Sequence, residues 1–88
     1  MESLGWREGA EIDGIVESFN SEEGWGVISS PATPGGCFVH FSTIVMSGFH
    51  VLRAGQRVTF TYEEPGFLQD GYRFRSLRVS PADEGDPR

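Results

Sequence analysis

Apolar and polar residues alternate along short stretches of this chain, and segments rich in glycine and proline separate these stretches. The alternation is regular over residues 56–64 (QRVTFTYEE), where Val58, Phe60 and Tyr62 share one face, and it returns over residues 72–80 (YRFRSLRVS). Because alternate side chains of a β-strand point to the same face, this period of two predicts strands.

β-Branched and aromatic residues, which favour strands, extend the pattern to five segments. We predict strands over residues 11–20, 24–30, 36–41, 56–64 and 71–79. Glycines and prolines in the connecting segments argue against a helix of ordinary length. Five antiparallel strands in so short a chain suggest a closed barrel, because closure leaves no strand edge exposed. The predicted fold class is therefore all-β, a five-stranded antiparallel closed barrel.

Length and composition fit a single domain. The chain has 88 residues, of which 38% are hydrophobic and 23% charged, a globular balance. We expect the domain over residues 11–80, a flexible N-terminal arm over 1–10 and an acidic flexible tail over 81–88. The N-terminus lacks the apolar core of a signal peptide, and no stretch approaches the length of a membrane span. We therefore expect a soluble, cytoplasmic protein with no membrane partner.

Residue types that carry catalysis or hold metals are sparse. The only cysteine, Cys37, is expected to face inward and be inert, and with two distant histidines it does not form a zinc-site spacing. Glu22 and Glu23 are adjacent carboxylates in an expected turn, where such pairs are usually solvated. The sequence has no nucleophile–base arrangement and no phosphate loop. We expect no enzymatic activity, no cofactor and no metal.

Charge is distributed unevenly along the chain. Residues 1–31 carry seven carboxylates and one arginine, whereas residues 32–82 carry five arginines and three carboxylates. Every fixed cation is an arginine, and the formal net charge is −6. An acidic protein is not what strong polyphosphate binding predicts, although net acidity can also serve solubility alone.

Strand parity predicts where the aromatic rings lie. In the second and third expected strands it places Trp25, Phe38 and His40 on the outer face, and Ile28, Val39 and Phe41 in the core. Outward rings are poor for solubility but suit the stacking of single-stranded bases.

Residues 24–26 read Gly-Trp-Gly, although glycine weakens a strand. Two interpretations remain open at this point. The glycines could leave open backbone on which a base or ribose lies. Alternatively, Gly24 belongs to the turn and Gly26 relieves crowding in a bent barrel strand.

Three motifs together resemble the bacterial cold-shock domain family, over about residues 14–79. They are GIVESFNSEEGWGVI, CFVHFSTI and GFHVLRAGQRVTFTYE. The resemblance implies an oligonucleotide/oligosaccharide-binding (OB) barrel that binds single-stranded DNA or RNA, as many RNA chaperones and regulators of gene expression do. It also implies a turn-forming role for Asn20. The surface positions that it implies are Phe19, Trp25, Phe38, His40, Phe41 and Phe49, with Phe19 and Phe41 partly buried.

The chain departs from the family pattern where a ligand would lie. Ser18 stands for a stacking tryptophan, Val27 for a phenylalanine, and Glu17 and Glu23 for lysines. Each lost ring could remove about 1–3 kcal/mol of binding, and carboxylates repel phosphate. Arg73, Arg75 and Arg78 in the last strand could restore a phosphate track, or pair with the acidic N-terminal third.

Two functions follow from these observations. The first is single-stranded nucleic-acid binding through the outward rings, with Arg73 and Arg75 as phosphate contacts and with weaker affinity than typical family members. The alternative is a degenerate cold-shock barrel that serves as a protein-interaction domain.

Overall fold

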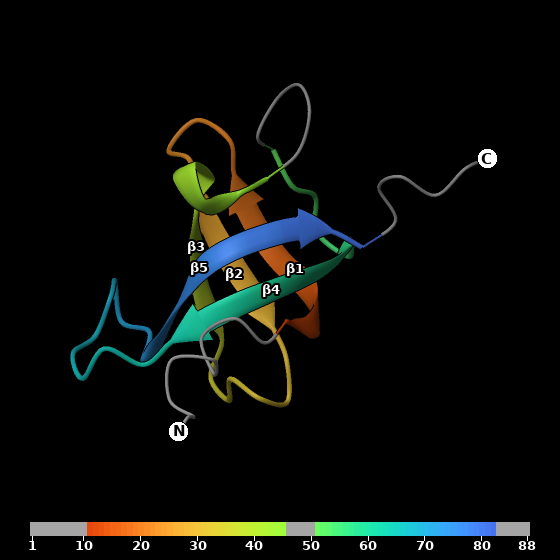
Figure 1. Ribbon diagram of the computed structural model, residues 1–88. Coiled ribbons are helices and arrows are strands. Elements are labelled where there is room, and N and C mark those ends of the chain that lie inside the picture. Colours follow the sequence, from red (N-terminus) through yellow and green to blue (C-terminus); the bar gives the residue numbers. More distant parts are fainter. Residues whose placement is uncertain (1–10, 46–50, 83–88) are drawn as a thin grey trace.

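The computed structural model describes residues 11–45 and 51–82. It contains a short 3₁₀ turn, η1 (Phe41–Thr43), and five strands: β1 (Ile12–Asn20), β2 (Trp25–Ser29), β3 (Cys37–His40), β4 (Arg57–Glu63) and β5 (Phe74–Pro81). The strands wrap into a barrel, with η1 at one end (Figure 1). All five predicted strands are present. Within the described residues, no helix is both long and apolar enough to cross a membrane.

The barrel closes in the order β1-β2-β3-β5-β4. Four of its seams are antiparallel, but β3 and β5 run parallel where Cys37 faces Phe74 and Phe38 faces Arg75. The prediction of an antiparallel barrel is therefore correct for four seams and wrong for the seam between β3 and β5. A closed ring of five strands cannot alternate direction at every seam, because five is odd.

Strand β1 pairs with β4 through its first half and with β2 through its second half. Ile12–Ile15 pair with β4, and Ile15–Asn20 pair with β2, with a register shift between Val16 and Ser18. Gly14 pairs with Val58 of β4, where side chains of neighbouring strands come close to its backbone. A Cβ built there would lie 2.6 Å from Ile28 Cγ2 and 2.7 Å from the Phe60 ring.

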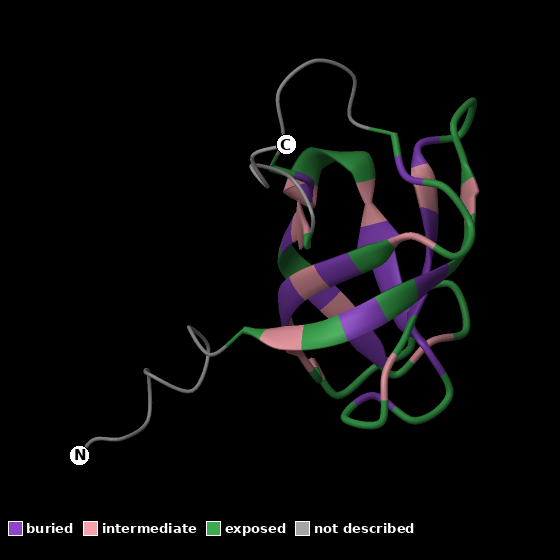
Figure 2. Cartoon of the chain, turned by 90° about the vertical axis from the view of Figure 1, so that its right-hand side faces the viewer, coloured by how far each residue is buried: buried purple, intermediate pink, exposed green. Residues whose placement is uncertain are grey.

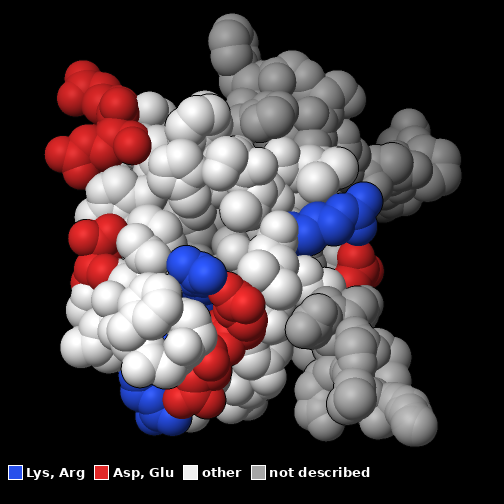
Figure 3. Space-filling view, turned by 60° about the vertical axis from the view of Figure 1, so that its left-hand side comes forward, with Lys and Arg blue, Asp and Glu red and all other residues white. Residues whose placement is uncertain are grey.

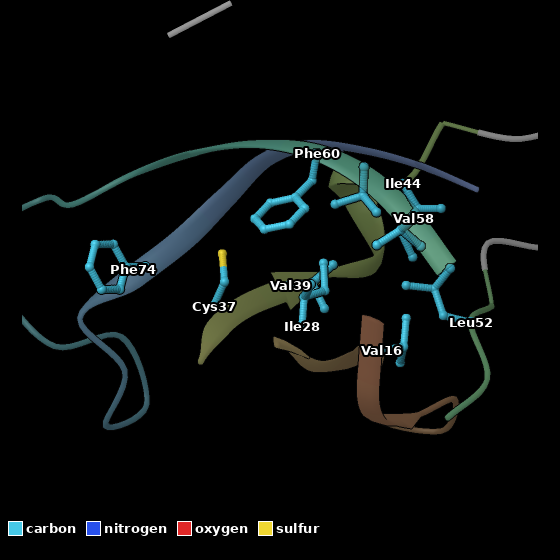
Figure 4. Packing of buried hydrophobic residues seen from close by; sticks show 10 residues of the cluster. Val16, Ile28, Cys37, Val39, Ile44, Leu52, Val58, Phe60 and Phe74 are labelled. Carbon is cyan, nitrogen blue, oxygen red and sulfur yellow. The ribbon is translucent and has the colours of Figure 1, made fainter. Parts of the chain in front are cut away.

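The core fills the barrel with side chains from all five strands and from the β3–β4 connection. Burial changes from residue to residue along the strands (Figure 2). Figure 4 shows the Phe60 ring near the centre of the cluster, and Phe60 has no exposed surface. The buried members are Val16, Ile28, Cys37, Val39, Ile44, Leu52, Val58, Phe60, Phe74 and Val79.

Cys37 is fully buried in this core, as expected from the sequence. Burial raises the pKa of its thiol from 9.0 to about 12, because the thiolate would be desolvated. The protonated thiol is unreactive, so we expect the folded protein to resist dithionitrobenzoate at pH 8 and to react once unfolded in urea. The pKa of Cys37 is higher in the folded state than in the unfolded state, so the free energy of unfolding depends on pH. The stability that comes from burying the protonated thiol is fully present below about pH 9 and is lost as the pH rises toward 12. Rapid labelling of the folded protein would contradict the buried position.

Candidate functional site

Four rings from β2, β3 and η1 gather on the outside of the barrel. Trp25 faces His40 across the β2–β3 ladder. The Trp25 and Phe38 rings stack at 5.4 Å between centroids with an interplanar angle of 25°, and the His40 and Phe41 rings lie 4.7 Å apart. We call Trp25, Phe38, His40 and Phe41 the aromatic face. The sequence prediction that Trp25, Phe38 and His40 are neighbours on one face is confirmed.

The prediction that Phe38 is solvent-accessible was wrong. Phe38 is only 8% exposed, and its partner across the ladder, Val27, is 3% exposed. The alternation of the strands places both side chains on the outer face of the sheet, but neighbouring residues shield them from solvent. Tyr72 is close to this region, because a Cβ on Gly36 would lie 2.8 Å from Val27 and 3.2 Å from Tyr72. Phe38 therefore supports the Trp25 ring rather than offering a free stacking surface of its own.

The prediction that Phe41 lies in the core was also wrong, since Phe41 is 46% exposed. Strand β3 ends at His40, and Phe41 begins η1, so the alternation of the strand does not extend to it. Its ring instead joins the aromatic face. Phe19, by contrast, is partly buried and packs against the core.

The two glycines beside Trp25 make room for the protein's own atoms. Gly24 has a φ of +80°, and a Cβ there would lie 2.8 Å from the Phe41 ring. A Cβ on Gly26 would lie 2.1 Å from the Ser18 carbonyl oxygen and 2.7 Å from Phe19 Cα. These contacts favour the barrel-geometry interpretation over the one in which open backbone receives a ligand.

A short chain of hydrogen bonds fixes the Trp25 ring. Asn20 Oδ1 accepts from the Glu23 backbone N–H at 2.9 Å, which confirms the predicted turn-forming role of Asn20. The Trp25 indole N–H then donates to Glu23 Oε1, also at 2.9 Å. Glu23 thus orients the ring and adds negative charge beside it.

His40 is held by the turn that follows it. Its Nδ1 accepts from the Ser42 backbone N–H at 3.3 Å and lies 2.8 Å from Ser42 Oγ. Because Nδ1 is an acceptor, the neutral ring carries its proton on Nε2, to which no hydrogen bond is made within residues 11–45 and 51–82.

The arginines of β5 and of the loop before it are paired with carboxylates. Arg73 contacts Glu64 at 2.8 Å, and Arg75 contacts Glu63. Arg78 lies 3.4 Å from Glu11, so among the described residues Arg78 is the one of these three arginines that pairs with the acidic N-terminal third. Ion pairs at the surface contribute about 0–1 kcal/mol to stability, but they reduce the positive charge offered to a phosphate. On the face shown in Figure 3, basic side chains lie next to acidic ones, while other acidic side chains stand apart.

A groove of about 490 Å³ adjoins the aromatic face. Trp25, Phe38 and His40 line one side, and β5 and the β4–β5 loop line the other with residues that include Asp70 and Arg75. The sequence analysis did not identify Asp70. The Asp-Gly pair at residues 70–71 predicts a turn, but only the folded chain places that turn beside Trp25.

Phe49, the remaining predicted position, lies outside the described residues. Of the other predicted positions, the structure brings Trp25, Phe38, His40, Phe41 and Arg75 to one region. Phe19 packs against the core, and Arg73 lines a separate depression with residues of the β4–β5 loop.

Comparison with known proteins identifies the family. Residues 12–71 match the model of the "'Cold-shock' DNA-binding domain". This chain belongs to the cold-shock domain family. The match spans more than half of the chain and includes β1 to β4 and the aromatic face.

Bacterial cold-shock proteins are similar over much of this cold-shock domain. "Cold shock-like protein CspA" of Vibrio cholerae is 44% identical over 54 residues, which are 61% of this chain and 77% of the relative. A "Cold shock-like protein" of Aquifex aeolicus is 38% identical over 66 residues, 75% of this chain and 90% of the relative. The solved structure "drosophila Unr CSD456" has a TM-score of 0.62 at 17% identity, and its match covers 97% of this chain and 34% of that one. It supports the fold alone.

Proposed function

We propose that this cold-shock domain binds single-stranded DNA or RNA on the aromatic face, as a non-catalytic module in the cytoplasm. The observation that carries the proposal is the aromatic face itself, in which the partly exposed Trp25 ring stacks on Phe38 beside a groove of about 490 Å³. Unpaired bases stack on such rings with about 1–3 kcal/mol each, whatever their identity. RNA chaperoning or regulation of gene expression would be the biological use of this binding.

We propose further that affinity and its salt dependence are both lower than in typical family members. Arg73 and Arg75 are already paired with Glu64 and Glu63. A phosphate that engages either arginine must displace a carboxylate, so fewer counterions are released for each contact. Glu23 adds a repulsive charge at the edge of the Trp25 ring.

A fluorescence titration with a pyrimidine heptamer at two salt concentrations tests this proposal. In a Trp6→Phe background, a base stacked on Trp25 should quench the remaining indole signal. No quenching at high micromolar oligonucleotide would count against nucleic-acid binding. A steep loss of affinity with salt would instead count against neutralised arginines.

Glu23→Gln should tighten binding about two- to fivefold at low salt, because it removes a carboxylate from the phosphate path. The Gln side chain keeps an oxygen that can accept from the Trp25 indole, so the ring should stay in place. The gain should shrink at high salt, where exposed charges are screened. The same titration measures this effect, and Glu11→Gln, which removes a carboxylate paired with Arg78, is the matched control. An equal gain in both variants would mean that only net charge matters.

Protein interaction is the second candidate function. The observation in its favour is a pair of exposed apolar side chains in the β4–β5 loop, Phe67 at 56% and Leu68 at 63%. Apolar groups that stay exposed on a small barrel often mark a contact surface. The fluorescence titration distinguishes nucleic-acid binding from protein interaction. If the domain binds only proteins, adding an oligonucleotide should not quench the fluorescence of Trp25.

A further inference from the structure

The β4–β5 loop ends in a tight hairpin. Gln69 and Tyr72 exchange two backbone hydrogen bonds, of 2.8 and 2.9 Å, across a two-residue turn. Asp70 and Gly71 occupy that turn with φ angles of 53° and 90°. Positive φ at both positions is the type I′ arrangement that Asp-Gly favours. The turn chemistry therefore fixes the position of Asp70 at the edge of the groove.

Asp70 differs from the other carboxylates near the aromatic face. Glu23 accepts from Trp25, Glu63 from Arg75 and Glu64 from Arg73. In residues 11–45 and 51–82, no hydrogen bond or ion pair engages the Asp70 carboxylate. Asp70 is exposed and lines the groove together with Trp25 and His40. Asp70 thus offers an acceptor that no group in the described part of the chain uses.

An unpaired carboxylate in this groove restricts how a nucleotide can lie there. A phosphate beside Asp70 would be repelled, so the sugar–phosphate chain should pass away from it. A base stacked on Trp25 can instead turn its hydrogen-bonding edge toward Asp70. The 4-position of a pyrimidine lies opposite the glycosidic N1, so with the sugar turned away from Asp70 it is the ring position nearest the carboxylate. The carboxylate can only accept, and at that position cytosine presents an amino donor where uracil presents a keto acceptor; the N3–H donor of uracil lies to one side.

We propose that Asp70 makes this domain prefer cytosine over uracil or thymine at the base that stacks on Trp25. The inference rests on the proposed function. Stacking alone reads base identity poorly, so any preference must come from polar groups at the edge of the ring platform. The neighbouring Gln69 can donate as well as accept, and therefore does not by itself favour either base.

The test compares oligo-dC and oligo-dU heptamers, which differ in the base edge but not in size or charge. The wild-type protein should bind oligo-dC about three- to tenfold more tightly. Asp70→Asn should remove or reverse this ratio, because an amide can donate to the uracil keto oxygen. Asparagine tolerates positive φ as well as aspartate does, so the turn should be preserved. Asp13→Asn, which removes the same charge beside a different depression on the barrel, should leave the ratio unchanged.

The outcomes of this comparison separate a failure of the cytosine preference from a failure of nucleic-acid binding itself. A preference for oligo-dC that is lost in Asp70→Asn and kept in Asp13→Asn supports the inference. Equal affinity of the wild type for both oligomers, or a ratio unchanged in Asp70→Asn, overturns it while the proposed function stands. Failure to bind either oligomer overturns the proposed function, and the preference with it.

Discussion

Gly26→Ala should destabilise the barrel by about 3 kcal/mol or more, the upper range for overpacking. In an ordinary strand the same change stabilises, because alanine loses less backbone entropy than glycine. Here the added Cβ would lie 2.1 Å from the Ser18 carbonyl oxygen and 2.7 Å from Phe19 Cα. Both atoms belong to the backbone of β1, which cannot move without losing its pairing with β2. Urea unfolding monitored by circular dichroism measures the loss.

Gly55→Ala is the matched control for this substitution. Gly55 has a φ of +90°, but a Cβ there would meet nothing within 4 Å. The control should cost only the conformational penalty of positive φ, about 1–2 kcal/mol. If Gly26→Ala proves neutral or stabilising, the close contact between β1 and β2 is not the reason for glycine at this position.

Trp25→Ala should weaken the binding of single strands by about 5- to 150-fold, the equivalent of one lost stacked base. Trp25→Phe should lose much less, because it keeps a ring on Phe38 and gives up only the hydrogen bond to Glu23. Anisotropy of a dye-labelled heptamer measures both affinities without relying on tryptophan fluorescence. Circular dichroism should verify that both variants remain folded.

Phe67→Ala provides the comparison for Trp25→Ala. Phe67 is 56% exposed and lines a separate depression formed by the β4–β5 loop. Its removal should change affinity by less than about twofold if bases stack on the aromatic face. A large loss in Phe67→Ala with little loss in Trp25→Ala would move the binding surface from the aromatic face to the loop.

Local sequence pattern was sufficient for the strands and for the family, but not for details that depend on distant contacts. Alternation identified β4 closely, because buried Val58 and Phe60 alternate with the less buried Arg57 and Thr59 until the register shift at Thr61. It failed at Phe41, where β3 ends one residue earlier than predicted and η1 redirects the ring. It also failed at Phe38, since parity gives the face of a residue but not what covers that face.

In the candidate site, too, features set by neighbouring residues were predictable, whereas features set by contacts between distant segments were not. The rings were found from the motifs, and Trp25 beside His40 follows from strand pairing. The pairing of Arg75 with Glu63 depends on the β4–β5 register, which the sequence did not supply. Asp70 reaches the groove only because a long loop folds back as a hairpin, and its turn signal carries no information about that destination.

The parallel seam between β3 and β5 has a mechanical consequence. Only two residue pairs join these strands, so this seam is where the barrel should open first during local unfolding. Phe38 and Arg75 face each other across the seam, and both also line the groove. A single-stranded nucleic acid bound in the groove would therefore contact both strands of this seam and stabilise their pairing. Binding of the nucleic acid would then make local opening of the barrel less frequent. The resistance of the protein to proteolysis would therefore increase with ligand concentration.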